Sequence, residues 1–309
     1  MPTESVSLQS SLPAYFTSAT AEALGLRRRQ LASMVESGAL RRPFRDVYVS
    51  AEVPDTIDTR IAAVKLVLPK HAVLVDRTAA WVWGVDTLRH WELDLLPRLE
   101  VFVLRGHKRV TRSEAGGGTR DLADRDLAEV GGVLVTTPLR TALDLCCRLP
   151  RYGALAAADA LAREYSLKSH QMQRELVRFR RRRGVVQARA LVQLVDPRAE
   201  SPGESFTRLA IVEAGLPVPE AQHWVEVDGV RRYRLDLAYP RLRICIEYDG
   251  EEFHSTPERR AADERRRAWL RGQGWHVIVV KKGAFRGPEF DDWLRELRRV
   301  FAERTARMY

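Results

Sequence analysis

The chain has 309 residues, of which 45% are hydrophobic and 30% are charged. This balance excludes a disordered chain and indicates a folded protein long enough for two domains or three. A net charge of +10 and a pI near 9.9, with arginine preferred over lysine, favour a polyanionic partner, nucleic acid before membrane. The alternative explanation for this charge is arginine-rich codon usage.

The cysteines and the apolar segments predict a soluble cytoplasmic protein. Cys146, Cys147 and Cys245 are odd in number and partly adjacent, which suits neither a disulfide framework nor a zinc site. The polar N-terminus has no signal-peptide pattern. Charged residues interrupt the most apolar stretch, Ile61 to Val85, so we expect it not to span a membrane.

The first 50 residues predict two short helices followed by a pair of strands. Hydroxyl residues precede a helix from Ala21 to Leu24, Gly25 ends it, and a second helix runs from Arg27 to Ser37. A basic strand pair follows from Arg41 to Val49. This order is the layout of a winged helix-turn-helix, with DNA contacts expected from the recognition helix and the wing. The candidate DNA-binding residues are Arg27, Arg28, Arg29, Arg41, Arg42 and Arg45. A helical hairpin with solvated arginines is the alternative.

The middle of the chain predicts strands and then helices, without a catalytic constellation. Strands are expected at Leu99 to Leu104 and Gly131 to Thr136, and helices at Pro138 to Leu149 and Ala154 to Tyr165. The arginine-rich run from Arg178 to Gly184 is either a solvated helix end or linker, or a phosphate clamp.

The last hundred residues predict the element order α-β-β-β-α-β and a closing helix. The expected helices are 202–214, 257–271 and 288–304, and the expected strands are 221–227, 233–239, 244–250 and 275–281. A turn at Asp228-Gly229 joins the first two strands. The final β-α-β crossover requires its two strands to be parallel.

A hairpin in this segment places two carboxylates face to face. Matching the apolar faces of its arms sets Tyr239 opposite Ile244, Leu237 opposite Ile246, and Leu235 opposite Tyr248. Asp236 and Glu247 then lie opposite each other on the other face. Because like charges at that spacing repel, a cation is expected between them, with a divalent metal as the first candidate and arginine side chains as the second.

The element order and these residues resemble the PD-(D/E)XK, restriction-endonuclease-like nucleases, specifically the branch related to very-short-patch-repair endonucleases. The matching residues are Asp236, the Glu247-Tyr248-Asp249 strand, His254, Asp263 to Arg266 and Gly274-Trp275. The resemblance covers about 200–285 and implies a glutamate in the first helix of the site, here Glu204. Asp249 stands where that family has a lysine, and Lys281, Lys282 or His254 could take the role of this lysine.

The first part resembles AbiEi-type antitoxins. Phe16 to Ser50 is similar to their winged-helix domain, and Asp76 to Gly84 and Thr136 to Asp144 are similar to segments that accompany it. The resemblance implies DNA binding in a defence or toxin–antitoxin setting. The predicted fold class is therefore α/β multi-domain. Its parts are a winged helix-turn-helix (1–95, with following helices), an α+β middle region with a basic linker (96–198) and a restriction-endonuclease-like core (199–309).

The predicted chemistry is hydrolysis of a phosphodiester with Mg²⁺ or Mn²⁺ as cofactor, because a carboxylate-held cation activates water and neutralises phosphate charge. Asp236 and Glu247 are the expected metal ligands, aided by the Tyr248 carbonyl. The candidate catalytic residues are Glu204, Asp236, Glu247, Asp249 and His254. For Asp249 a salt bridge to Arg234, or turn chemistry alone, is the alternative.

Three functions follow from these patterns. The first is a Mg²⁺-dependent DNA endonuclease, the second a catalytically inactive repressor or antitoxin-like protein, and the third an RNA nuclease. The expected partners are DNA and a cognate toxin or defence-system protein, with no membrane. Because cutting both strands takes two sites or two successive nicks, a homodimer is one expected arrangement.

Overall fold

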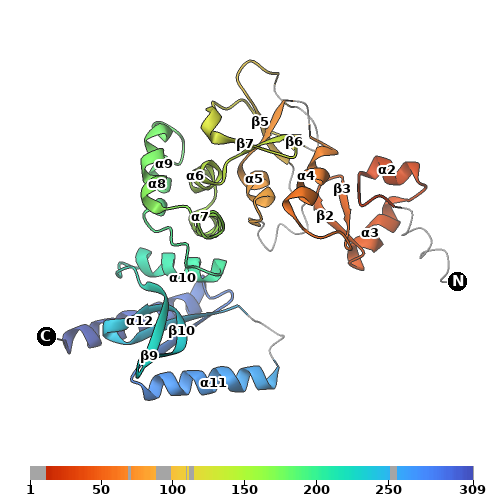
Figure 1. Cartoon of the computed structure of the whole chain (residues 1–309). Coiled ribbons are helices and arrows are strands. Elements are labelled where there is room, and N and C mark those ends of the chain that lie inside the picture. The colour runs from red at the N-terminus through yellow and green to blue at the C-terminus, as the bar shows by residue number, and fades with distance from the viewer. Residues whose placement is uncertain are drawn as a thin grey trace. The chain divides into compact units, whose positions relative to one another are not determined.

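The computed structural model describes residues 12–68, 71–87, 99–108, 110, 115–250 and 256–308, and they divide into two compact units, residues 1–144 and 145–309 (Figure 1). The division lies inside helix α6, Pro138–Arg148. In the described part of the chain, no helix is both long and apolar enough to cross a membrane.

Residues 15–50 of the first unit form two short helices and an antiparallel sheet of order β1-β3-β2. Both predicted helices are present. The hydroxyl of Thr17 accepts a hydrogen bond from the backbone N–H of Thr20 at the start of the first, and Gly25, with φ +83°, follows its end. The elements are β1 (Tyr15–Phe16), α2 (Ser18–Ala23), α3 (Arg28–Glu36), β2 (Leu40–Phe44) and β3 (Val47–Ser50).

A second sheet of the first unit has the order β6-β5-β4-β8-β7. The predicted strand at Leu99 is present, but Gly131 and Gly132, with φ +55° and +76°, form the turn before β8 rather than its start. The elements are α4 (Ile57–Lys65), β4 (Ala72–Leu74), α5 (Asp76–Val82), β5 (Leu99–Val103), β6 (Ala115–Gly116), η2 (Asp124–Asp126), β7 (Leu127–Val130) and β8 (Val133–Thr136). The predicted domain boundary at 95/96 falls between β4 and β5, which pair.

The second unit begins with helices α7 (Arg151–Tyr165), α8 (Ser169–Glu175), η3 (Leu176–Phe179) and α9 (Val185–Val192). The arginine-rich run from Arg178 to Gly184 is the end of η3 and the turn that follows. In this turn a Cβ on Gly184 would lie 1.9 Å from the Cys147 carbonyl oxygen, so only glycine fits. The Arg182 guanidinium lies 4.5 Å from the ring centroid of Phe179. The phosphate-clamp interpretation of this run stays a prediction.

The remaining elements have the predicted order α-β-β-β-α-β and a closing helix. They are α10 (Pro202–Glu213), β9 (Glu220–Val227), β10 (Val230–Tyr239), η4 (Pro240–Leu242), β11 (Ile244–Asp249), α11 (Pro257–Gly272), β12 (His276–Lys281) and α12 (Gly287–Ala306). The sheet order is β12-β11-β10-β9, and β11 and β12 are parallel, as the crossover requires.

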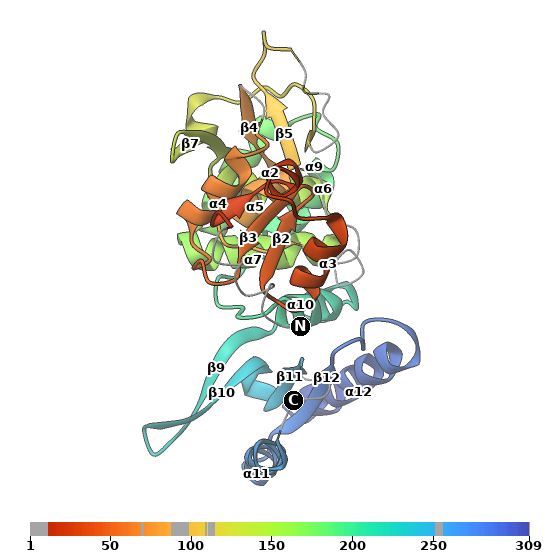
Figure 2. The ribbon, with the colours of Figure 1, turned by 90° about the vertical axis from the view of Figure 1, so that its right-hand side faces the viewer.

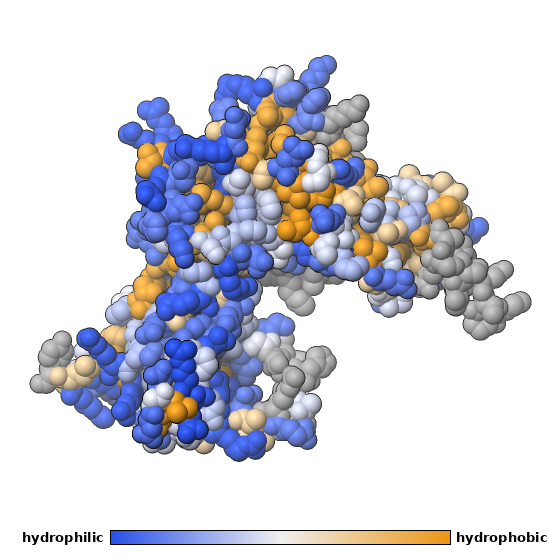
Figure 3. All heavy atoms as spheres, viewed as in Figure 1, coloured by the Kyte–Doolittle hydropathy of each residue, from blue (hydrophilic) through white to orange (hydrophobic). Residues whose placement is uncertain are grey.

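Helices cover both faces of this sheet (Figure 1). Apolar residues of α10 and α12 pack with Ile246 and Ile278 on one face. Leu270 of α11 packs with Leu235 and Cys245 on the other. The outward side of α11 carries mainly hydrophilic residues (Figure 3). The central strands of the sheet are therefore buried between helical layers, whereas the ends of β9 and β10 nearest their connecting turn are more exposed.

A buried ion pair joins α7 to α10 within the second unit. Asp159 and Arg208 are each 1% exposed, and the carboxylate of Asp159 pairs with the guanidinium of Arg208. Asp159 also accepts hydrogen bonds from the Ser205 hydroxyl, at 2.6 Å, and from the Asp196 N–H, at 2.8 Å. The predicted domain boundary at 198/199 thus falls inside one compact unit.

Candidate functional site

The predicted register between β10 and β11 is confirmed at two pairs. Leu237 lies opposite Ile246 and Tyr239 opposite Ile244. The ladder stops there, without the predicted pair of Leu235 with Tyr248. It stops because the Asp236 carboxylate accepts a hydrogen bond from the backbone N–H of Tyr248, at 2.9 Å. A side chain thus takes the place of a ladder partner, and the two strands diverge around Asp236.

The carboxyl group of Asp236 lies among other charges. Burial raises its pKa to about 6, while the hydrogen bond from Tyr248 opposes that shift. The negative charges of Glu204 and Glu247 also raise the pKa and the positive charge of Arg266 lowers it, and the value of about 6 includes all of these effects. The raised pKa of Asp236 therefore reflects in part the two carboxylates, Glu204 and Glu247, that the sequence predicts at this site.

Glu247 is 2% exposed and is paired with two arginines of α11. Its Oε1 lies 2.7 Å from Arg266 Nη2, and its Oε2 lies 3.2 Å from Arg267 Nε. Two guanidinium groups thus compensate the charge of Glu247, in line with the second of the two candidates, and the metal stays a prediction. Sequence reasoning named Arg266 only within a motif and missed Arg267. Helical spacing could have found both, because each lies three or four residues before the buried Leu270.

Glu204 is buried and helps to cap the N-terminus of α10. One carboxylate oxygen accepts from the Ser201 hydroxyl at 2.8 Å, and the other accepts from the Glu200 N–H at 3.0 Å and from Gln222 Nε2 at 2.8 Å. The Ser201 hydroxyl in turn accepts from the Glu204 N–H, which makes a reciprocal helix cap. Glu204 therefore has a structural function as well as an effect on the pKa of Asp236.

Asp249 forms an ion pair with Arg267, at 3.7 Å, while Arg234 forms one with Glu200, at 2.7 Å. Arg234 was the partner expected for Asp249, so the geometry favours α11 over β10 as the source of its compensating charge. Asp249 lies beside Lys281 in the parallel register of β11 and β12. His254 lies outside the described residues.

The carboxylates of the site offer few ligands for a metal, so the predicted Mg²⁺ would have to keep most of its water. Within the described residues no group of three or more His, Cys, Asp or Glu side chains is placed to hold a metal. Mg²⁺ commonly binds proteins through one or two carboxylates and retains several waters. Asp236 Oδ1 has no hydrogen-bond partner among the described residues, so it is available as a ligand. Glu247 is a hard oxygen donor whose charge is already compensated.

The N-terminal arginines divide into two groups. Arg27 is the N-cap of α3, and Arg28 and Arg29 follow it, all three exposed, and their contact with DNA stays a prediction. Arg45 is exposed in the turn between β2 and β3. In contrast, the other two candidate arginines, both on β2, are half-buried and engaged locally. Arg41 donates to the Val53 carbonyl at 2.5 Å, and the Arg42 guanidinium lies 5.2 Å from the Tyr48 ring centroid.

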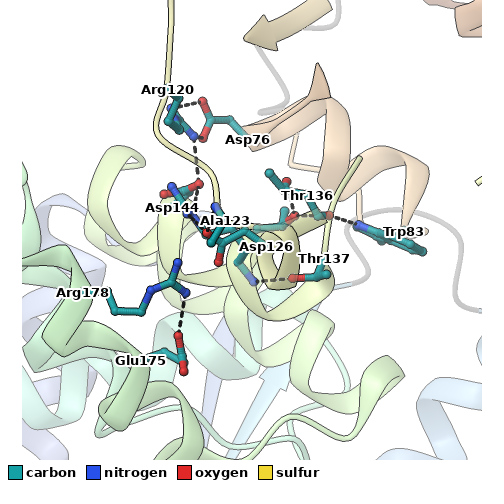
Figure 4. A network of polar contacts seen from close by, with 12 residues as sticks. Asp76, Trp83, Arg120, Ala123, Asp126, Thr136, Thr137, Asp144, Glu175 and Arg178 are labelled. Atoms are coloured by element: carbon teal, nitrogen blue, oxygen red, sulfur yellow. Dashed lines mark hydrogen bonds and ion pairs between the residues drawn. The ribbon is translucent and has the colours of Figure 1, made fainter. Parts of the chain in front are cut away.

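The interior of the first unit contains a network of five charged residues (Figure 4). Arg120 Nη1 lies 3.0 Å from Asp76 Oδ1 and 2.8 Å from Asp144 Oδ2. Arg140 lies 2.8 Å from Asp144 and 2.8 Å from Asp126. Asp76 and Asp144 come from the two segments that resemble AbiEi antitoxins, and Arg120 joins them. Sequence reasoning missed this network, which holds those segments together in the fold.

The raised pKa of Asp236 predicts how stability changes with pH. Between pH 4 and pH 6 the folded state holds a proton that the unfolded state has lost, so stability falls as pH rises through this range. We expect the metal-free Asp236→Asn variant to gain up to about 2–3 kcal/mol over the natural protein between pH 4 and pH 7. Urea unfolding at several pH values measures this difference, with the exposed-turn variant Asp228→Asn as control. Parallel pH profiles for Asp236→Asn and the natural protein would contradict it.

Comparison with known proteins identifies relatives of the chain. Residues 71–197 match the model of the AbiEi antitoxin C-terminal domain. Two proteins of Mycobacterium tuberculosis, the uncharacterized proteins MT2308 (strain CDC 1551 / Oshkosh) and Rv2248 (strain ATCC 25618 / H37Rv), are each 34% identical over 259 residues, covering 82% of this chain and 90% of theirs.

Among solved structures, the catalytic domain of the homing endonuclease I-Bth0305I is similar to part of this chain. The match covers 33% of this chain and 95% of that domain, at 17% identity and a TM-score of 0.26. The AbiEi match contains both the Asp76 and the Asp144 segment, which confirms this part of the predicted resemblance. The chain belongs to the family of these two mycobacterial proteins, and its residues 71–197 are similar to the AbiEi antitoxin C-terminal domain.

Proposed function

We propose that the protein is a Mg²⁺-dependent DNA endonuclease of a defence or toxin–antitoxin system, with a PD-(D/E)XK-type site in its C-terminal part. The observation that carries this proposal is the position of Asp236. Its carboxylate lies where β10 and β11 diverge, near Glu204 and Glu247, with one oxygen available and a raised pKa. Ionisable groups perturbed by burial and by like charges are typical of catalytic and metal sites.

Each residue has a distinct role in this proposal. When bound, Mg²⁺ supplies an activated water and neutralises charge on the phosphate. Asp236 and Glu247 hold the cation. Arg266 and Arg267 fix the orientation of the Glu247 carboxylate through their ion pairs, and Asp249 fixes Arg267. The Tyr248 N–H fixes Asp236.

The N-terminal helices and hairpin are the proposed winged-helix DNA-binding part, acting through Arg27, Arg28, Arg29 and Arg45. Their exposure at a helix start and a hairpin turn supports this role. The resemblance to AbiEi antitoxins supports a toxin or defence protein as partner.

A specific observation favours a second candidate function, a non-cutting DNA-binding repressor of the antitoxin type. Two guanidinium groups already compensate Glu247, so the buried carboxylate needs no metal for its charge. In addition, Asp249 stands where the resembling nucleases have a lysine. In this case the C-terminal part binds DNA without cleaving it.

Incubation of the natural protein with supercoiled plasmid separates the two functions. We expect nicked or linear product with Mg²⁺ or Mn²⁺ and none with EDTA. A matched incubation with RNA tests the substrate class. Intact plasmid under every metal condition, together with metal-independent and sequence-specific binding to promoter DNA, rejects the nuclease and supports the repressor.

A further inference from the structure

Strands β9 and β10 extend beyond the sheet as a two-stranded ribbon. The pairs between β9 and β10 run from Val227 opposite Val230 to Ala238 opposite Glu220. Strand β10 pairs with β11 only from Leu237 to Tyr239. Residues 223–235, which we call the β9–β10 ribbon, therefore pair only with each other (Figure 2). Its tip is the two-residue turn Asp228-Gly229, in which both residues have positive φ, +53° and +74°. Such turns match the twist of a hairpin and keep it well defined.

The two faces of the ribbon differ. On one face Val225 and Leu235 are buried, and the Tyr233 ring packs edge-on against Trp269 of α11, with centroids 5.1 Å apart. This contact supports the ribbon against the rest of the unit. The other face carries Trp224, which is 39% exposed although it is a large aromatic side chain. The ribbon is thus a supported arm with one open face.

Arginines surround the exposed indole. The guanidinium groups of Arg231 and Arg234 lie 5.5 Å and 5.9 Å from the Trp224 ring centroid. Their acidic partners are Glu226 and Glu200, in ion pairs whose side chains are all at least 40% exposed. Exposed pairs of this kind contribute only about 0–1 kcal/mol, so a phosphate can replace them.

We propose that the β9–β10 ribbon binds duplex DNA, with Trp224, Arg231 and Arg234 as its contact residues. A two-stranded ribbon fits the major groove, and arginine binds both phosphate oxygens and guanine edges. Arg232 is exposed on the same ribbon and forms no ion pair with a described residue, which adds a further available cation.

The position of the ribbon ties it to the carboxylates. Asp236 follows Arg234 by two residues on β10, and Arg266, a partner of Glu247, donates to the Arg234 carbonyl at 3.3 Å. DNA on the ribbon lies next to the site proposed above. The inference rests on the proposed function for the choice of DNA, although binding by the ribbon needs neither metal nor cleavage.

The test is the affinity of the full chain for a fluorescent DNA duplex, measured by anisotropy in EDTA over a range of salt concentrations. Arg231→Ala/Arg234→Ala is compared with Arg295→Ala/Arg299→Ala, a pair on α12 that is 72% and 57% exposed and also ion-paired. Both double variants lose the same charge. We expect the ribbon variant to lose about tenfold or more in affinity and to lower the salt slope by about 2, and the control to change little.

Two further results decide the inference. Trp224→Ala is expected to weaken binding with an unchanged salt slope, and circular dichroism checks that each variant is folded. Equal affinities for the ribbon and control variants overturn the inference. So does a loss of affinity that is measured with a single-stranded probe of the same sequence but not with the duplex. If the natural protein binds through the ribbon but cuts nothing, the nuclease proposal fails and this inference stands.

Discussion

Replacing Asp236 by alanine is expected to reduce Mg²⁺-dependent cleavage by about 100-fold or more, because a bound cation contributes several kcal/mol to the stabilisation of transition-state charge. The variant removes a carboxylate whose Oδ1 accepts no hydrogen bond from a described residue. It also removes a carboxyl group whose burial opposes ionisation, so we expect no large loss of stability. Plasmid cleavage measured under single-turnover conditions gives the ratio of rates.

Two variants control this result. Asp292→Ala removes an exposed aspartate of α12, which pairs with Arg295, and should cut as the natural protein does. Asp236→Asn keeps an oxygen that can accept the Tyr248 N–H and loses only the charge, so its rate should fall with that of the alanine variant. Cleavage that persists at the natural rate in either Asp236 variant would assign the activity to another site.

Replacing Asp159 by alanine is expected to destabilise the second unit by about 3–5 kcal/mol. The change leaves the guanidinium of Arg208 buried without its counter-charge, and removing one partner of a buried pair costs about that much. The Ser205 hydroxyl and the Asp196 N–H lose an acceptor as well. Urea unfolding measures the loss.

A double replacement separates the ion pair from the packing around it. Asp159→Leu/Arg208→Met removes both charges and keeps apolar volume, so it should recover most of the lost stability. If the double variant is as unstable as Asp159→Ala, the buried charges are not the cause. Exposed Arg198→Ala, which removes a surface ion pair to Asp196, is the control for an ordinary arginine.

The sequence predicted the C-terminal fold well where side chains alternate along a strand. The alternation in β10 and β11 allows only one register, and the observed pairs of Leu237 and Tyr239 have it. The parallel pairing of β11 with β12 follows from the helix that connects them, because such a crossover brings the chain back to start the next strand at the same end of the sheet. Strands β1 and β4 have two and three residues, too few for a detectable period.

The contacts of the site were predictable only in part, because they depend on long side chains from other elements. The register predicts that Asp236 and Glu247 lie near each other, and the negative charge of Glu247 does raise the pKa of Asp236. The pairing of Glu247 with Arg266 and Arg267 depends on how α11 lies over the sheet. Likewise, the basic strand predicts a DNA contact for Arg41, but it does not predict the hydrogen bond that its guanidinium donates to the Val53 carbonyl.

The ion pair between α7 and α10 bears on how such a protein can change by recombination. Residues 71–197 are the stretch shared with the antitoxins, but the two compact units divide that stretch at residue 144. Asp159 lies inside the shared stretch and Arg208 lies after it. A recombination event that exchanged only the segment after residue 197 would therefore leave one buried charge of this pair without its partner. The two segments are expected to be inherited together.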